Sequence, residues 1–209
     1  MPTKDRNLSL PAESRFYEQL RFFMDKEFIQ IRWHGRGGQG AITAAKIVAS
    51  AAFASGYDGV VMAPTFGTER RGAPVMTSLK ISKTKIYDLS PIETPDIVVV
   101  LDHLLLKETD VTHGLKKGGV IVLNTPMAFE SYSFTDFKLA SADITAISVE
   151  AGLPHGMVNT GMIGSLEKAT NLLGMDLLIK CIEEEFSSRK PQKNSLAAKI
   201  AYERTRVGG

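Results

Sequence analysis

Four glycines within six residues constrain this chain more than any other feature of its sequence. They lie in His34-Gly35-Arg36-Gly37-Gly38-Gln39-Gly40, between an alternating apolar stretch at residues 28–33 and an alanine-rich segment that predicts a helix over residues 41–54. Glycine has no Cβ atom, so it permits positive φ and close approach of backbone N–H groups. A strand, a glycine loop and the positive dipole end of a helix together predict a cradle for an anion.

The spacing of Gly35, Gly37 and Gly40 fits G-x-G-x-x-G, the fingerprint of dinucleotide-binding proteins. That fingerprint also needs an acidic residue at the end of the next strand, about 20 residues on, to hold the ribose hydroxyls. The next predicted strand, residues 57–63, ends in apolar residues, and Asp58 lies at its start. The sequence therefore disfavours free NAD(P) or FAD. Two interpretations stay open: an anion site, or glycines that only let the first helix pack closely on its strand.

A second loop, at residues 64–74, is bounded by two prolines and contains Glu69, Arg70 and Arg71. Its proline and glycine content indicates a shaped loop. Loops at the carboxyl ends of neighbouring strands in a doubly wound sheet meet in one crevice, so we expect this loop to lie beside the glycine loop. Its arginines could then bind phosphate oxygens, with Glu69 orienting one of them. The alternative is an arginine pair solvated in a surface loop.

These two loops supply the candidate anion-binding residues. Each offers either backbone that can approach an anion or a side chain that can contact or orient one; they are Gly35, Arg36, Gly37, Gly38, Gln39, Gly40, Glu69, Arg70, Arg71 and Gly72. The sequence contains no G-x-S-x-G elbow, no paired-histidine metal motif, no Walker A lysine after the glycines and no Cys/His cluster. We therefore predict no catalytic residue and no metal ligand, and expect the chain to help build a site whose chemistry lies on another chain.

The composition narrows the class of protein. The 209 residues can form one domain, and 25 Lys plus Arg against 23 Asp plus Glu leave a net charge of +2, which indicates neither nucleic-acid nor membrane-surface binding. No apolar run approaches the roughly 20 residues that span a bilayer, and the charged N-terminus has no signal core, so we expect a cytoplasmic protein. Cys181 is the single cysteine, in a helical pattern that suits a buried position. A disulfide framework and a self-contained iron–sulfur cluster are excluded.

The periodicity of the remaining chain predicts an α/β fold: a three-layer Rossmann-like domain with a mostly parallel, partly mixed sheet, helices on both faces and a helical C-terminal part. The expected elements are a hairpin from residues 75–81 and 85–88, strands at 96–101, 120–123 and 141–149, and helices at 104–115, from 159, at 176–186 and at 194–202. We expect Asp102 to cap the helix at 104–115, and Asn or Thr residues to cap the helices that begin near 159 and 194.

The first 27 residues are expected to be an extension to this domain. Residues 11–25 carry Phe16, Leu20 and Phe23 at helical spacing, which predicts an amphipathic helix that packs on its own domain or on a partner. We therefore divide the chain into an N-terminal helical extension, residues 1–27, and a single α/β domain, residues 28–209.

Three segments together resemble one family. The segment Ile31 to Gly40, the loop Phe66-Gly67-Thr68-Glu69-Arg70-Arg71-Gly72-Ala73-Pro74 and the strand Asp96-Ile97-Val98-Val99-Val100-Leu101-Asp102 are similar to the gamma subunits of pyruvate:ferredoxin oxidoreductase (pyruvate synthase) and related 2-oxoacid:ferredoxin oxidoreductases. The segment Asn159-Thr160-Gly161-Met162-Ile163-Gly164 looks like the start of that family's closing helices. The resemblance covers about residues 28–202, and residues 1–27 are longer than the family's usual start.

This resemblance implies a subunit of an enzyme that oxidatively decarboxylates a 2-oxoacid onto coenzyme A and reduces ferredoxin or flavodoxin. It implies alpha, beta and delta partner subunits, which hold thiamine diphosphate, magnesium and [4Fe-4S] clusters. The loop at residues 69–74 favours pyruvate as the 2-oxoacid, and the predicted anion site would bind phosphate groups of coenzyme A. The alternative that we keep is a stand-alone dinucleotide- or nucleotide-binding regulatory domain that uses the same crevice.

Overall fold

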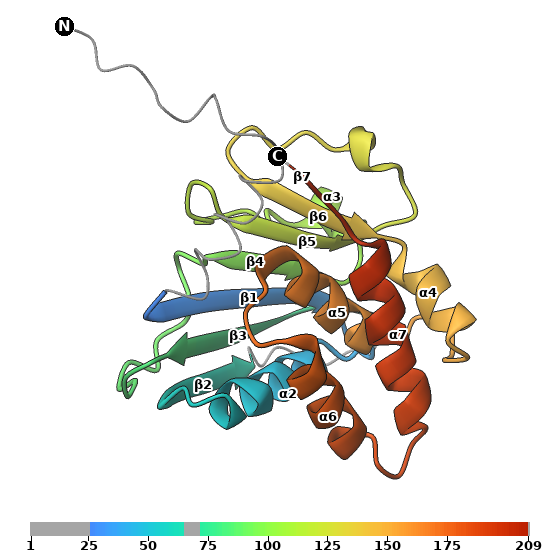
Figure 1. Ribbon diagram of the computed structural model, residues 1–209. Helices are drawn as coiled ribbons and strands as arrows, with labels where there is room; N and C mark the ends of the chain where they lie inside the picture. Colours follow the sequence, from blue (N-terminus) through green and yellow to red (C-terminus); the bar gives the residue numbers. More distant parts are fainter. Residues whose placement is uncertain (1–25, 65–71, 209) are drawn as a thin grey trace, which may run out of the picture.

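The computed structural model describes residues 26–64 and 72–208. They form an α/β fold around one seven-stranded sheet, which confirms the predicted fold class (Figure 1). The strands are β1 (Phe28–Arg36), β2 (Gly59–Pro64), β3 (Pro74–Ser82), β4 (Ile97–Val100), β5 (Val120–Asn124), β6 (Lys138–Ala142) and β7 (Arg206–Gly208). The helices are α2 (Ala41–Ala54), α3 (Leu105–Glu108), α4 (Ile144–Glu150), α5 (Asn159–Thr170), α6 (Met175–Glu185) and α7 (Pro191–Arg204), and a short 3-10 turn, η2, spans Phe129–Ser131.

The strand order is β2-β3-β1-β4-β5-β6-β7. Strands β1, β4, β5 and β6 are parallel and form the centre, whereas β3 is antiparallel to both β1 and β2, and β7 is antiparallel to β6. Strand β2 therefore runs in the same direction as β1, and both end at the same edge of the sheet. After β1 the chain forms β2 and β3 on one side of β1, and it then crosses to form β4 on the other side. The crevice between β1 and β4 is thus a topological switch point, the usual position of ligands in open α/β sheets.

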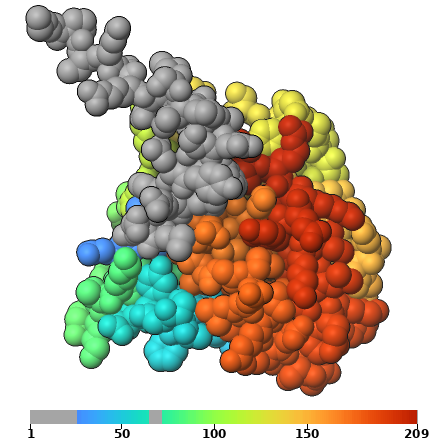
Figure 2. All heavy atoms as spheres, viewed as in Figure 1, coloured from blue at the N-terminus to red at the C-terminus, as the bar shows by residue number. Residues whose placement is uncertain are grey.

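The two faces of the sheet are covered unequally. Helices α2, α5, α6 and α7 cover one face, where a large apolar core contains Trp33, Ile97 and Val99 (Figure 1). Figure 2 shows the outside of this layer, with α5, α6 and α7 in orange and red and α2 beside them in cyan. On the other face, α3 and η2 pack over a smaller core around Val98 and Val100. Alternate residues of β4 thus serve both cores, as expected of a strand buried on both faces.

Helix α2 occupies the predicted range, residues 41–54. It begins after Gly40, whose φ is 83°, and Gly56, with a φ of 97°, follows its end. Its buried alanines let the helix lie close to the sheet. The apolar strands expected at 96–101 and 120–123 are also confirmed, as β4 and β5. Strand β1 is longer than predicted, because residues 34–36 continue its pairing with β3, and His34 also pairs with Val100 of β4, before the chain turns.

The strand predicted at residues 141–149 is wrong. Strand β6 ends at Ala142, and α4 begins two residues later. Two side chains determine this change: Asp143 Oδ1 accepts a hydrogen bond from the Ala146 N–H at 2.8 Å, and Asn124 Oδ1 accepts one from the Ile144 N–H at 2.9 Å. Satisfying the N–H groups of the first helical turn outweighs the strand-like alternation of the sequence.

Two other predicted elements are shorter than expected. Only α3 is helical within residues 104–115, although Asp102 Oδ1 does accept from the Leu104 N–H at 3.0 Å. The turns that follow place Val111 and Leu115 in the smaller core. The predicted hairpin is also wrong, because β3 pairs with β1 and β2, and residues 85–88 form no strand.

The predicted helix caps near 159 and 194 are wrong as well. Asn159 and Thr160 lie inside α5, which has no side-chain cap. Helix α7 begins at Pro191, a residue preorganised for the first helical turn, so Asn194 and Ser195 lie inside it. The helical C-terminal part and the buried position of Cys181 are confirmed.

The helix predicted at residues 11–25 lies outside the described residues. Within the described ranges, no helix is long and apolar enough to cross a membrane.

Candidate functional site

The glycine loop proper is the turn from Gly37 to Gly40. Gly38 and Gly40 adopt positive φ values of 95° and 83°, which L side chains rarely tolerate. The Gln39 side chain braces the turn, since its Oε1 accepts from the Arg36 N–H at 2.8 Å. Helix α2, which follows, has no side-chain cap and no acidic residue in its first turn. The positive end of its dipole is therefore not neutralised by a carboxylate of its own first turn.

The glycines of the motif differ in their surroundings. A Cβ on Gly35 would lie 3.3 Å from Ala41 Cβ, and one on Gly40 would lie 2.9 Å from Asn159 Nδ2. At Gly38, no heavy atom of the described residues would lie within 4 Å. Close packing of the first helix on its strand therefore fits Gly35, as one of the two sequence interpretations holds, and Gly40 packs against Asn159 of α5. Gly38 needs glycine for its backbone conformation alone as far as the described residues show.

The loops after β1 and β2 meet, as the sequence predicts. The Gly37 N–H donates to the Ala73 carbonyl at 2.9 Å, and the Gly72 N–H donates to the Gly37 carbonyl at 3.1 Å. This pair of bonds joins the glycine loop to the chain that enters β3. Glu69, Arg70 and Arg71 lie outside the described residues.

Arg36 binds two carboxylates from the segment that follows β4, which sequence reasoning missed. Its Nε donates to Asp102 Oδ2 at 2.7 Å, and its Nη2 and Nη1 donate to the two carboxylate oxygens of Glu108 at 2.6 and 3.1 Å. Hydrogen bonds from Arg36 to Glu108 and then to Asp102 raise the pKa of the guanidinium above its usual value. The available signal was the position of Asp102 directly after β4, the strand beside β1.

Beneath the loop, β1 carries a buried Arg32–His34 pair. His34 Nε2 accepts from Arg32 Nε at 3.0 Å, and Arg32 Nη2 donates to the carbonyls of Val111 and His113 at 2.9 and 2.6 Å. Burial, and secondarily the charge of Arg32, lower the pKa of His34 to about 4. His34 is therefore neutral at physiological pH, and the pair holds the 111–113 turn against the sheet.

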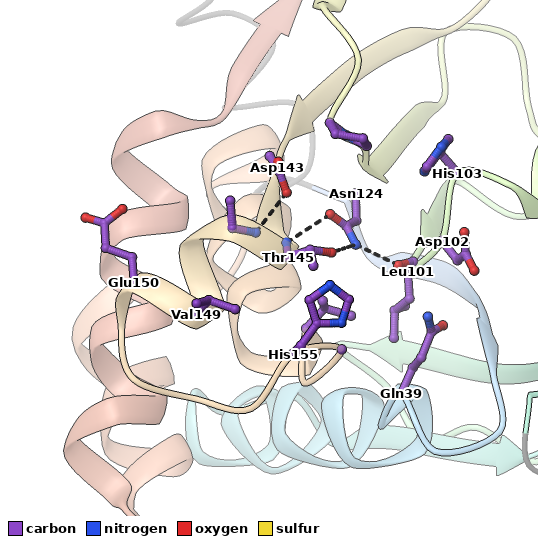
Figure 3. Close-up of a pocket in the computed structure, with 14 residues that line it drawn as sticks. Gln39, Leu101, Asp102, His103, Asn124, Asp143, Thr145, Val149, Glu150 and His155 are labelled. Atoms are coloured by element: carbon purple, nitrogen blue, oxygen red, sulfur yellow. Dashed lines mark hydrogen bonds between the residues drawn. The ribbon is translucent and has the colours of Figure 1, made fainter.

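A pocket of about 760 Å³ opens on the other side of the glycine loop, at the carboxyl ends of β4, β5 and β6 (Figure 3). It adjoins the topological switch point between β1 and β4. Its lining comes from the ends of the parallel strands, the start of α4 and the connection to α5, and consists of Gln39, Leu101, Asp102, His103, Asn124, Pro126, Asp143, Thr145, Ala146, Val149, Glu150, His155, Gly156 and Val158.

Asn124 organises one wall of this pocket. Its Nδ2 donates to the Leu101 carbonyl at 2.9 Å and to Thr145 Oγ1 at 3.1 Å, while its Oδ1 accepts from the N–H groups of Ile144 and Thr145 at 2.9 and 3.3 Å. In Figure 3, His155 lies opposite, between Asn124 and Gln39. Polar residues at the ends of two buried strands, Asn124 and Asp143, were the sequence signal for this pocket, and sequence reasoning did not use it.

The pocket's carboxylates are largely engaged. Asp102 binds Arg36, Glu150 forms a two-point ion pair with Arg204 at 2.6 and 2.8 Å, and Asp143 caps α4. Because these carboxylates already have partners, the pocket can bind a partly apolar group. Among the hydrogen bonds of the described residues, none joins two pocket side chains as a nucleophile and its general base.

The side chains of the described residues show whether this chain could hold a metal cofactor. No group of three or more His, Cys, Asp or Glu side chains within residues 26–64 and 72–208 could hold a metal ion. Cys181 is buried in α6, and burial, followed by the nearby Glu184, raises the pKa of its thiol. An iron–sulfur cluster needs about four thiolates, so this chain by itself does not fit one.

Comparison with known proteins identifies the family. The model of the family described as "Pyruvate ferredoxin/flavodoxin oxidoreductase" matches residues 30–204. The chain is 45% identical over 181 residues to the pyruvate synthase subunit PorC of Methanothermobacter marburgensis, a match that covers 87% of this chain and 99% of that one. It is also 45% identical over 184 residues to the pyruvate/ketoisovalerate oxidoreductases common subunit gamma of Thermococcus kodakarensis, covering 86% and 98% of the two chains.

A solved structure agrees with these relatives. The crystal structure of the pyruvate oxidoreductase subunit PORC from Thermotoga maritima is similar with a TM-score of 0.75 and 32% identity, and the match covers 88% of this chain and 100% of that one. The chain therefore belongs to the pyruvate ferredoxin/flavodoxin oxidoreductase family, in which it is a gamma-type subunit of a multi-subunit 2-oxoacid:ferredoxin oxidoreductase.

Proposed function

We propose that this gamma-type subunit works in a cytoplasmic complex that oxidatively decarboxylates pyruvate to an acyl-coenzyme A and CO2 and reduces ferredoxin or flavodoxin. Its partners are the alpha, beta and delta subunits, which hold thiamine diphosphate, magnesium and [4Fe-4S] clusters. The names of the relatives support pyruvate as substrate, since they are pyruvate synthase or pyruvate/ketoisovalerate oxidoreductase subunits. The single buried cysteine supports cluster binding by other chains.

This chain contributes an anion site for phosphate groups of coenzyme A. The observation that carries the proposal is the pair of backbone hydrogen bonds that joins Gly37 to Gly72 and Ala73. These bonds hold Gly72 and Ala73, which directly follow Arg70 and Arg71 in the sequence, against the glycine loop that precedes the uncapped N-terminus of α2. Backbone N–H groups and arginine side chains are the groups that bind phosphate in proteins.

Two single substitutions test this assignment in the assembled enzyme. An arginine–phosphate contact is a charge-assisted hydrogen bond of roughly 1.5–3 kcal/mol, so Arg70→Ala and Arg71→Ala should each raise the KM for coenzyme A about tenfold or more. The KM for pyruvate should stay nearly unchanged. Arg189→Ala, at an exposed arginine between α6 and α7, is the control for removing a positive charge elsewhere.

A different outcome would assign these arginines to the subunit interface. In that case both variants would leave coenzyme A kinetics unchanged and instead reduce association with the other subunits. Purification of the native protein tests the partners: it should copurify with larger chains that contain thiamine and iron–sulfur clusters. A lone protein that retains a nucleotide would support the regulatory alternative instead.

A further inference from the structure

Arg36 lies beside the proposed anion site, yet its donors already have partners. An arginine offers five N–H donors in a rigid planar fork. The two Nη groups of Arg36 bind both carboxylate oxygens of Glu108, and Nη1 also donates to the Gly72 carbonyl at 3.3 Å. The face of the guanidinium that would hold a phosphate is therefore occupied by a carboxylate of this chain.

The two carboxylates that bind Arg36 are held differently. The Asp102 side chain is 16% exposed, and its second oxygen accepts from the Leu104 N–H, so it is fixed at the end of β4. The Glu108 side chain is 44% exposed at the end of the short helix α3, and its hydrogen bonds among the described residues are those to Arg36. Although Glu108 binds Arg36 through two points, water and salt screen this pair more than the less exposed pair with Asp102. Glu108 is therefore the partner that an incoming anion can replace.

Arg36 lies where the two loops join, so a phosphate group that replaces Glu108 would be held at that junction. Its backbone N–H is bound by Gln39 in the glycine loop, and its Nη1 reaches Gly72, where the second loop joins the first. A phosphate group presents oxygens that an arginine fork binds through two points, as it binds a carboxylate. With Nε still bound to Asp102, the guanidinium stays at the junction of the two loops while its outer donors change partner.

We infer that Glu108 is a positioning residue that sets the affinity of the glycine-loop site for phosphate groups by competing for Arg36. This inference rests on the proposed function, in which the phosphate groups belong to coenzyme A. Loss of the Glu108 charge frees the two Nη groups, so it strengthens coenzyme A binding. A residue that only stabilised the fold would not produce a gain of affinity when removed.

The test uses the assembled oxidoreductase and coenzyme A as the probe. Glu108→Gln should lower the KM for coenzyme A about threefold, the size expected for an exposed ion pair, and should leave kcat and the KM for pyruvate unchanged. In an Arg36→Lys background, which lacks the fork, Glu108→Gln should have no further effect on the KM for coenzyme A. Glu185→Gln, which removes a carboxylate from the ion pair between α6 and Lys46 of α2, is the matched control.

Two results would overturn the role of Glu108. One is an unchanged or higher KM for coenzyme A in Glu108→Gln; the other is an equal decrease in the Arg36→Lys background, which would indicate a general effect of charge. The proposed function is judged separately by Arg70→Ala and Arg71→Ala. If those variants raise the KM and Glu108→Gln has no effect, the coenzyme A site stands and the role of Glu108 is rejected. If they leave the KM unchanged, the site assignment itself is wrong.

Discussion

The glycine loop and the pocket beside Asn124 lie at the same edge of the sheet but are built in opposite ways. The loop is made of backbone, held by Gly37, Gly72 and Ala73 through main-chain hydrogen bonds. The pocket is made of side chains from three parallel strands and the start of α4, with about 760 Å³ of open space. Gln39 belongs to both. The glycine motif thus marks where backbones approach closely, whereas the pocket is lined by residues that follow the ends of the neighbouring strands.

Asn124→Leu should have the largest effect on stability, because it removes the side-chain hydrogen bonds that hold the pocket wall together. Leucine keeps the volume but removes the partners of the Leu101 carbonyl and of the Ile144 and Thr145 N–H groups. Buried groups without partners cost roughly 1–3 kcal/mol each, so we expect about 4 kcal/mol less stability and a Tm lower by roughly 8–16 °C. Thr145→Val, which removes a single bond to Asn124, should cost about 1 kcal/mol.

Thermal unfolding followed by circular dichroism measures both variants of the pocket wall. Equal Tm values for Asn124→Leu and the unsubstituted protein would show that the amide does not hold the wall together.

Comparing Gly40→Ala with Gly38→Ala separates two reasons for glycine in this loop: positive φ and close packing. Both positions have positive φ, which costs an alanine about 1 kcal/mol. At Gly40 the new methyl group would also lie 2.9 Å from Asn159 Nδ2, so we expect a total loss of about 2–3 kcal/mol. Chemical denaturation of both variants checks this difference. If Gly38→Ala is as destabilising as Gly40→Ala, the packing of Asn159 is not what distinguishes them.

His34 should make stability depend on pH beneath the loop. Its pKa is about 4 in the folded protein and 6.5 without the fold's influence, so between these values the unfolded chain binds a proton that the folded chain does not. Stability should therefore fall as the pH drops from 6.5 to 4, by about 1.4 kcal/mol per pH unit at most and by about 2.5 kcal/mol over that range. The measurement is the free energy of unfolding of the natural protein and of His34→Gln from pH 4 to 8.

The two curves for His34 should run parallel above pH 6.5 and differ in slope below it. Parallel curves over the whole range would mean that His34 titrates normally in the folded protein. Because His34 does not line the pocket, this test measures the contribution of the strand beneath the glycine loop alone.

Local patterns in the sequence were sufficient for the parts of the fold that local physics determines. The glycine motif between an alternating strand and an alanine-rich segment predicted β1, the turn and α2, because glycine conformation and helix periodicity act over a few residues. Apolar runs predicted β4 and β5, since strands buried on both faces consist mostly of apolar residues. The meeting of the first two strand-end loops also followed, because parallel strands end at one edge.

Only the tertiary structure decided which side chains meet across that edge. Arg36 binds Asp102 and Glu108, which lie 66 and 72 residues away in the chain, and Asn124 sets the start of α4 through Ile144, 20 residues away. Those pairings depend on the order of the strands in the sheet. A local pattern cannot encode strand order, because the free energy of each contact depends on residues that only the complete fold brings within hydrogen-bonding distance.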